Sequence, residues 1–155
     1  MLSLQRKQYV QPLMDEILII LLLILLNGIF AMSEIAVIQA RKTTLSNDEK
    51  KGSKGARTAL RLANDPDRFL STVQIGITLI GILTGIYSGA SLSGKFSDVF
   101  ESFGMAERWA YPLAQGLIVI IVTYLTIIFG ELVPKRIGMS VAERVSKIIA
   151  RPMYV

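Results

Sequence analysis

Three long apolar segments constrain the fold of this chain more than any other feature of its sequence. The first contains an unbroken run of isoleucine and leucine at residues 17–26, and the others cover about residues 69–92 and 112–133. A helix needs about 20 apolar residues to cross a bilayer, because each residue rises about 1.5 Å. The pattern predicts an all-α membrane protein with three transmembrane helices, the first over residues 13–40, in a single domain spanning residues 1–155.

The first apolar segment has one alternative interpretation, a cleavable signal peptide. Arg6 and Lys7 would supply its positive start. The apolar run is long, however, and no small-residue cleavage site follows it. We therefore favour a membrane span, which reaches full length only if the polar stretch at residues 27–34 lies within the membrane or at its edge.

The charged segments indicate how the spans are oriented. Residues 41–68 carry eight basic and four acidic residues, and the tail from residue 131 carries five more basic residues. Because basic loops stay in the cytoplasm, this link and the C-terminus are predicted to lie on the cytoplasmic side of the cell membrane. The N-terminus and the connection at residues 93–110 are then outside. The same rule accounts for the net charge of +5, and no basic stripe with interleaved aromatic residues suggests a nucleic-acid partner.

Short juxtamembrane helices and one glycine-rich face complete the predicted architecture. Apolar residues at helical spacing predict a small interfacial helix within residues 93–110, and an amphipathic helix is predicted at residues 137–150. Gly81, Gly85 and Gly89 repeat every four residues and share one face of the second span. Such a face permits close packing within the chain or with a second copy, although glycine is also simply common in membrane helices.

The chain contains neither cysteine nor histidine. Thiolate zinc sites, imidazole ligands and histidine-based triads are therefore excluded. Any bound metal must be held by oxygen, which selects Mg²⁺, Ca²⁺ or an alkali ion. No phosphate-binding loop or nucleophile motif occurs, and the lysines lie outside the spans, so we do not expect an enzyme.

Glu131 is the leading candidate for a cation ligand, since an ionisable group within a span is costly. Pro134 would clash with the carbonyl of Gly130 four residues earlier, which frees that oxygen as a further ligand. The alternative is an ordinary ion pair between Glu131 and Lys135, four residues apart on a helix.

Neutral oxygens on the other two spans are candidates to complete a metal site. Ser33 offers a hydroxyl, and Gln74 and Thr78 share one face of the second span. A hydroxyl bonded to its own helix and hydrogen bonds between helices are the corresponding alternatives. Glu34 points about 100° away from Ser33, so we expect it to do a different job, such as pairing with a basic residue.

Two motifs in this order resemble the CNNM/CorC family of magnesium transporters: residues 30–36 (FAMSEIA) and residues 130–135 (GELVPK). The resemblance covers nearly the whole chain as the family's transmembrane domain. It implies a homodimer with an inward-facing acidic cavity for Mg²⁺, and Na⁺-linked Mg²⁺ export by alternating access. It also implies downstream cytosolic CBS modules, absent from this chain, through which ATP would act.

Carried over by position, the resemblance makes Ser33 and Glu131 the leading Mg²⁺ ligands and Pro134 the residue that breaks the helix. The chain departs from the usual pattern at Ala31, Met32 and Ile77, so one or two customary ligands are missing. Their replacements are then sought among Gln74, Thr78 and Asn27. A different class of function is the alternative to transport: a membrane regulator that senses Mg²⁺ without transporting it, or a scaffold for another transporter.

Overall fold

A computed structural model of the protein describes residues 2–153, and every element in that range is helical. The elements are α1 (Leu2–Gln39), α2 (Lys42–Lys50), α3 (Lys54–Asn64), α4 (Asp67–Ser102), α5 (Glu107–Ile127), the π-helical turn η1 (Ile128–Leu132), α6 (Val133–Ser140) and α7 (Ala142–Met153). Three helices are long and apolar enough to cross a membrane, covering Leu13–Gln39, Asp67–Ser102 and Glu107–Ser140. The predicted all-α membrane architecture is confirmed.

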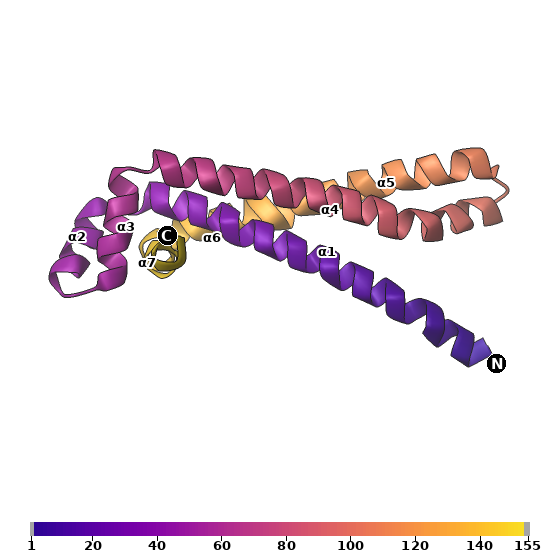
Figure 1. The fold of residues 1–155 in the computed structure, drawn as a ribbon, viewed down its shortest axis with the longest axis horizontal. Coiled ribbons are helices and arrows are strands. Elements are labelled where there is room, and N and C mark those ends of the chain that lie inside the picture. Colours follow the sequence, from indigo (N-terminus) through magenta and orange to yellow (C-terminus); the bar gives the residue numbers. More distant parts are fainter. Residues whose placement is uncertain (1, 154–155) are drawn as a thin grey trace.

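The long helices form an elongated bundle (Figure 1). Helices α4 and α5 run antiparallel as neighbours, while α1 packs against α4, η1 and α6. The N-terminal end of α1 diverges from the other two long helices. The short helices α2, α3 and α7 gather at the opposite end of the bundle, next to the C-terminal end of α1.

The connection between the second and third spans differs from the expected interfacial helix. Helix α4 continues without interruption to Ser102, ten residues beyond the predicted end of the span. No proline interrupts this stretch, so the helical hydrogen bonds continue through it. The chain reverses only at Gly104, whose φ of +91° is readily adopted by glycine.

The C-terminal helix is also divided differently from the prediction. Residues 137–140 complete α6, and the chain bends at Val141 before α7 begins. The polar link contains two helices, α2 and α3. Gly52, with φ +92°, makes the turn between them, and Ser53 caps α3 by accepting a hydrogen bond from the Ala56 amide. Helix α3 ends at Asn64, as the following Asp65-Pro66 pair predicts.

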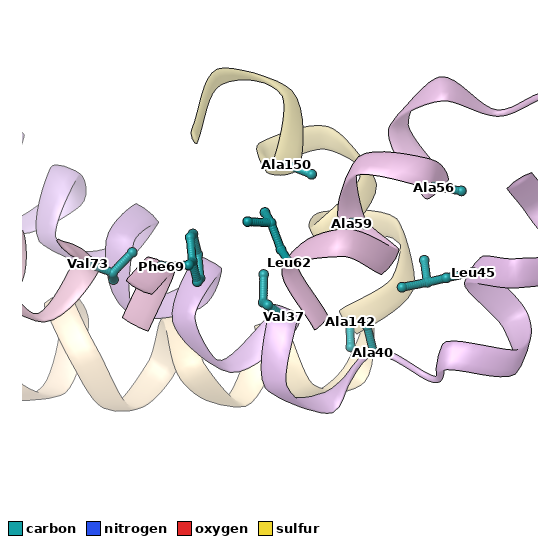
Figure 2. Close-up of a cluster of buried hydrophobic side chains, with 10 residues drawn as sticks. All are labelled: Val37, Ala40, Leu45, Ala56, Ala59, Leu62, Phe69, Val73, Ala142 and Ala150. Carbon is teal, nitrogen blue, oxygen red and sulfur yellow. The ribbon is translucent and has the colours of Figure 1, made fainter. Parts of the chain in front are cut away.

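Two apolar clusters hold the bundle together. The larger joins the short helices to the ends of α1 and α4 (Figure 2). Its buried members are Val37, Ala40, Leu45, Ala56, Ala59, Leu62, Phe69, Val73, Ala142 and Ala150. The smaller cluster lies between the spans and contains Ile20, Ile24, Leu92, Ile118 and Val122. The many alanines in the first cluster let α3 and α7 approach the bundle closely, and this packing holds the C-terminal end of α1 in place.

Candidate cation site

The sequence GELVPK folds into a π-helical turn between α5 and α6. Pro134 has no amide hydrogen, and its ring would collide with the Gly130 carbonyl in a regular α-helix. A turn wider by one residue relieves that conflict, and such turns are frequent at functional sites. The interruption expected at Pro134 therefore takes the form of a local widening, and helical structure continues to Ser140.

Glycines bring α1 unusually close to this widened turn. A Cβ placed on Gly28 would lie 2.9 Å from Cγ of Pro134, and one on Gly138 would lie 2.8 Å from the Met32 carbonyl oxygen. A Cβ on Gly130 would lie 3.2 Å from the Ile24 carbonyl oxygen. The absence of side chains at these positions permits the close helix contact on which the site depends.

Asn27 forms the polar contact between α1 and the π-helical turn. Its Nδ2 donates a hydrogen bond of 3.0 Å to the Gly130 carbonyl oxygen, and the residue is only 3% exposed. The Oδ1 atom of the same side chain is buried and has no hydrogen-bond partner among the described residues. A buried amide oxygen without a partner costs about 1–3 kcal/mol, so a ligand that reached this atom would relieve that cost.

Lys135 bridges the two acidic residues of the site. Its ammonium lies 2.9 Å from Oε1 of Glu131 and 3.3 Å from Oε2 of Glu34. The Glu34 side chain is 18% exposed, and its Oε2 makes no well-aligned hydrogen bond within the described part of the chain. Two carboxylates share one ammonium, which leaves the group with a formal charge of −1.

A cavity of about 220 Å³ opens beside Glu131 and Asn27. Helix α5 lines it with Thr123 and Thr126, and α4 lines it with Gly81 and Gly85. Since a water molecule occupies about 30 Å³ of liquid, the space corresponds to about seven waters. The cavity therefore has room for a hydrated metal ion or a small organic cation.

The predicted ligands are not all in this cavity. Ser33 is fully buried, donates a 2.6 Å hydrogen bond to the Ile29 carbonyl of its own helix, and lines a different cavity. Gln74 and Thr78 lie exposed on the surface of α4. The structure thus brings Glu131 and the Gly130 carbonyl together with Asn27, whereas Ser33, Gln74 and Thr78 do not line this cavity.

The three glycines predicted as a packing face divide into two kinds. A Cβ on Gly89 would lie 3.4 Å from Val119 of α5, so this glycine packs against the third span. Gly81 and Gly85 have no atom within 4 Å of such a Cβ and instead border the cavity. Their absent side chains leave the space that the cavity occupies.

Two features of the site were underestimated from the sequence. The family resemblance makes Asn27 only a replacement ligand, although an amide that follows ten consecutive isoleucines and leucines is costly at membrane depth and so signals a function. The expected pairing of Glu34 with a basic residue is confirmed, but its partner, Lys135, depends on how α1 meets α6 and has no signal in local spacing. Among the described residues, no three acidic, histidine or cysteine side chains cluster as a dedicated metal cage.

Comparison with known proteins now places this geometry in a family. The model of the family described as the cyclin M transmembrane N-terminal domain matches residues 18–155. The chain belongs to this family. UPF0053 protein sll0260 of Synechocystis is 44% identical over 140 residues, which cover 90% of this chain and 31% of that protein.

Two further relatives of this cyclin M domain carry a functional name. The polyamine export protein of Escherichia coli K12 is 36% identical over 91% of this chain and 31% of its own length. The polyamine export protein of Haemophilus influenzae is 32% identical over 88% of this chain and 32% of its own. The chain thus spans about a third of the length of these relatives, and within that third it is a membrane domain.

Proposed function

We propose that this chain is the membrane domain of a Mg²⁺ transporter in the cell membrane, with Glu131 and Asn27 at the centre of its cation site. The observation that carries the proposal is the buried, unpartnered Oδ1 of Asn27, a residue that lines the same cavity as Glu131. Mg²⁺ binds oxygen, keeps several of its waters and commonly uses one or two carboxylates. A hydrated ion in a cavity of about seven waters' volume agrees with that preference.

Lys135 supplies the positive charge that the site needs between transport events. When a cation enters the cavity, it replaces the Lys135 ammonium as the partner of Glu131, and Lys135 keeps its contact with Glu34. Competition between the ion and the ammonium limits the affinity, which allows the ion to leave again. A transporter needs this balance, because a site that binds too tightly releases its cargo slowly.

The other predicted ligands would take part only after a helix movement or in the presence of a second copy of the chain. Ser33 would turn from the Ile29 carbonyl toward the ion when α1 shifts during alternating access. Gln74 and Thr78 face outward on α4, where a second copy of the chain could cover them in a homodimer. Gly81 and Gly85 would keep the path beside them open for the ion.

The direction of transport rests on charge and family. Placing the basic link at residues 41–68 in the cytoplasm puts the π-helical turn nearer the cytoplasmic surface, as an inward-facing exporter requires. Na⁺ would drive the export, and ATP would act only through cytosolic modules beyond this domain. These properties belong to the whole protein, of which the chain matches about a third in its relatives.

A polyamine is the second candidate cargo, favoured by the names of two relatives and by the position of Lys135. The ammonium of the Lys135 side chain lies within 3.3 Å of an oxygen of each carboxylate, Glu34 and Glu131. The ammonium of a diamine would make the same contacts, and two relatives are named polyamine export proteins. The cavity holds either cargo by volume. Cavity volume therefore does not discriminate between Mg²⁺ and a polyamine, and a transport experiment is needed to do so.

Reconstitution of the purified protein into liposomes tests the proposal. We expect an internal Mg²⁺ indicator to report flux that depends on the protein, whereas labelled putrescine stays where it was loaded. Putrescine flux without Mg²⁺ flux would transfer the site to polyamine export. No flux of either cargo, together with Mg²⁺-dependent thermal stabilisation, would favour the non-transporting regulator instead.

A further inference from the structure

The cavity beside Glu131 has a second hydroxyl-bearing wall on α5, where Thr126 lines it together with Asn27. The Thr126 side chain is partly buried, whereas Thr123, which also lines the cavity, is exposed. Thr126 is therefore the more enclosed of the two threonines that an ion in this cavity would meet.

Thr126 and Asn27 both pack against Gly130 of the π-helical turn. A Cβ placed on Gly130 would lie 3.4 Å from Cγ2 of Thr126 and 3.3 Å from Nδ2 of Asn27. The two side chains belong to different spans, so the close approach of α1 to the third span brings them together. A ligand that reaches Asn27 from the cavity therefore also comes close to Thr126.

The hydrogen bonds of these two side chains leave their oxygens as acceptors. Oγ1 of Thr126 donates a 2.7 Å hydrogen bond to the Val122 carbonyl oxygen, which can only accept. A hydroxyl has one hydrogen, so Thr126 has none left to donate and keeps lone pairs for a ligand. Asn27 has a similar arrangement, because its Nδ2 donates to the Gly130 carbonyl and its Oδ1 has no partner among the described residues.

This combination of oxygens favours a cation over an anion. The Glu131 carboxylate and the two acceptor oxygens attract a metal ion or the hydrogens of its bound waters. Donation to a backbone carbonyl also polarises the Thr126 hydroxyl, which makes its oxygen a better acceptor. Since Mg²⁺ usually keeps several of its waters, the contact can be direct or through one of them.

We infer that Thr126 is a further ligand of the cation site and contacts Mg²⁺ or one of its bound waters through Oγ1. The inference rests on the proposed function, because it requires Mg²⁺ to enter the cavity beside Glu131. A hydrogen bond from threonine to its own helix has no functional meaning by itself. Thr84 makes the same 2.7 Å bond to the Ile80 carbonyl, but it does not line this cavity.

Mg²⁺ titrations of the purified protein in detergent, followed by thermal unfolding, test the inference. Because Mg²⁺ that binds the folded state raises the melting temperature, the dependence of the shift on Mg²⁺ concentration gives the affinity. We expect Thr126→Val to weaken Mg²⁺ binding about tenfold, the effect of losing one hydrogen bond to a charged group. Thr126→Ser keeps the hydroxyl and should bind Mg²⁺ as the original protein does.

Thr84→Val is the matched control for these titrations. It removes a buried hydroxyl with the same helical hydrogen bond outside the cavity, so the affinity for Mg²⁺ should not change. Melting temperatures without Mg²⁺ report whether each variant folds. Should Thr126→Val fail to fold, Thr126→Ala removes the same oxygen with a smaller side chain, and we expect the same loss of affinity.

Glu131→Gln distinguishes failure of this inference from failure of the proposed function. If Glu131→Gln weakens Mg²⁺ binding while Thr126→Val and Thr126→Ala bind as Thr84→Val does, the inference is overturned and the proposed function stands. Equal weakening in Thr126→Val and Thr84→Val, or no recovery in Thr126→Ser, would also overturn it, because the effect would then be one of packing. An identical response to Mg²⁺ in Glu131→Gln and the original protein would overturn the proposed function and this inference with it.

Discussion

The side-chain amide of Asn27 donates a 3.0 Å hydrogen bond to the Gly130 carbonyl, 103 residues away in the sequence. This contact joins the first span to the π-helical turn of the third. Pro134 exposes the Gly130 carbonyl, and the glycines at positions 28 and 138 let α1 come close enough to use it. The site therefore depends on the contact between these two helices. The contribution of this contact to stability can be measured separately from transport.

Replacing Asn27 with Leu should lower the stability of the bundle. The expected loss is about 0.6–1.7 kcal/mol, the range measured for hydrogen bonds between membrane helices. Thermal unfolding in detergent reports it. Thr84→Val is the matched control, because within the described residues its buried hydroxyl donates to the Ile80 carbonyl of its own helix, so its loss should cost less. Equal losses in the two variants would contradict a special role for the contact between the helices.

Gly138→Ala should separate α1 from α6. Its new Cβ would lie 2.6 Å from Cγ2 of Ile35, and overpacking of this kind costs about 1–3 kcal/mol. Gly116→Ala adds the same methyl group to α5 where no atom lies within 4 Å, so it should be neutral or stabilising. Melting temperatures of the two variants provide the comparison. A Gly138→Ala protein as stable as the Gly116→Ala protein would argue against the close approach.

Lys135→Gln should destabilise the protein by about 1–3 kcal/mol, because it leaves the largely buried Glu34 without its counter-ion. Adding Glu34→Gln to the same protein should restore most of the loss. Mg²⁺ should also stabilise the single variant more than the original protein, since Glu131 no longer has a competing ammonium. Thermal shifts with and without Mg²⁺ measure both effects, and an unchanged Mg²⁺ response would rule out the competition proposed for Lys135.

Acid should loosen the contact between α2 and α7. Asp48 accepts a 2.5 Å hydrogen bond from Lys147, and chiefly this bond lowers the pKa of Asp48 below its ordinary value of 3.8. A carboxyl group whose folded pKa is lowered stabilises the fold above its unfolded pKa, and this contribution disappears as the pH falls through the folded value.

The Lys147→Gln variant tests that pH dependence. Its melting temperature should fall less than that of the original protein between about pH 6 and about pH 3, because it has already lost the contribution. Arg57→Gln, which removes a more exposed pair with Glu49, serves as the control and should follow the original protein. Parallel curves for the original protein and Lys147→Gln would contradict the assignment.

The sequence predicted the three spans because long apolar runs have few folded alternatives in any environment. It also predicted a helix interruption at Gly130 and Pro134, since a proline ring clashes with the carbonyl four residues earlier in the same helix. The ends of α4 and α6 were predicted less well. Residues 93–102 continue the second span because nothing in them stops a helix, and their polarity alone suggested a separate segment.

The remaining features of the site depend on how helices far apart in the sequence pack together, and the sequence does not predict that packing. The contact between Glu34 and Lys135 depends on the rotation of α1 against α6, which glycine packing determines. Likewise, Ser33 and Glu131 lie in motifs that the family resemblance pairs, yet they line different cavities here. Helix periodicity reports the face of one helix and carries no information on which neighbour covers it.

Mg²⁺ flux through liposomes that contain the Glu131→Gln variant tests the central claim most directly. The substitution keeps the size of the side chain and removes the charge, so we predict that flux falls to the level of protein-free liposomes. Glu107→Gln, at an exposed position at the start of α5, should transport as the original protein does. Full Mg²⁺ flux in the Glu131→Gln protein would contradict the account.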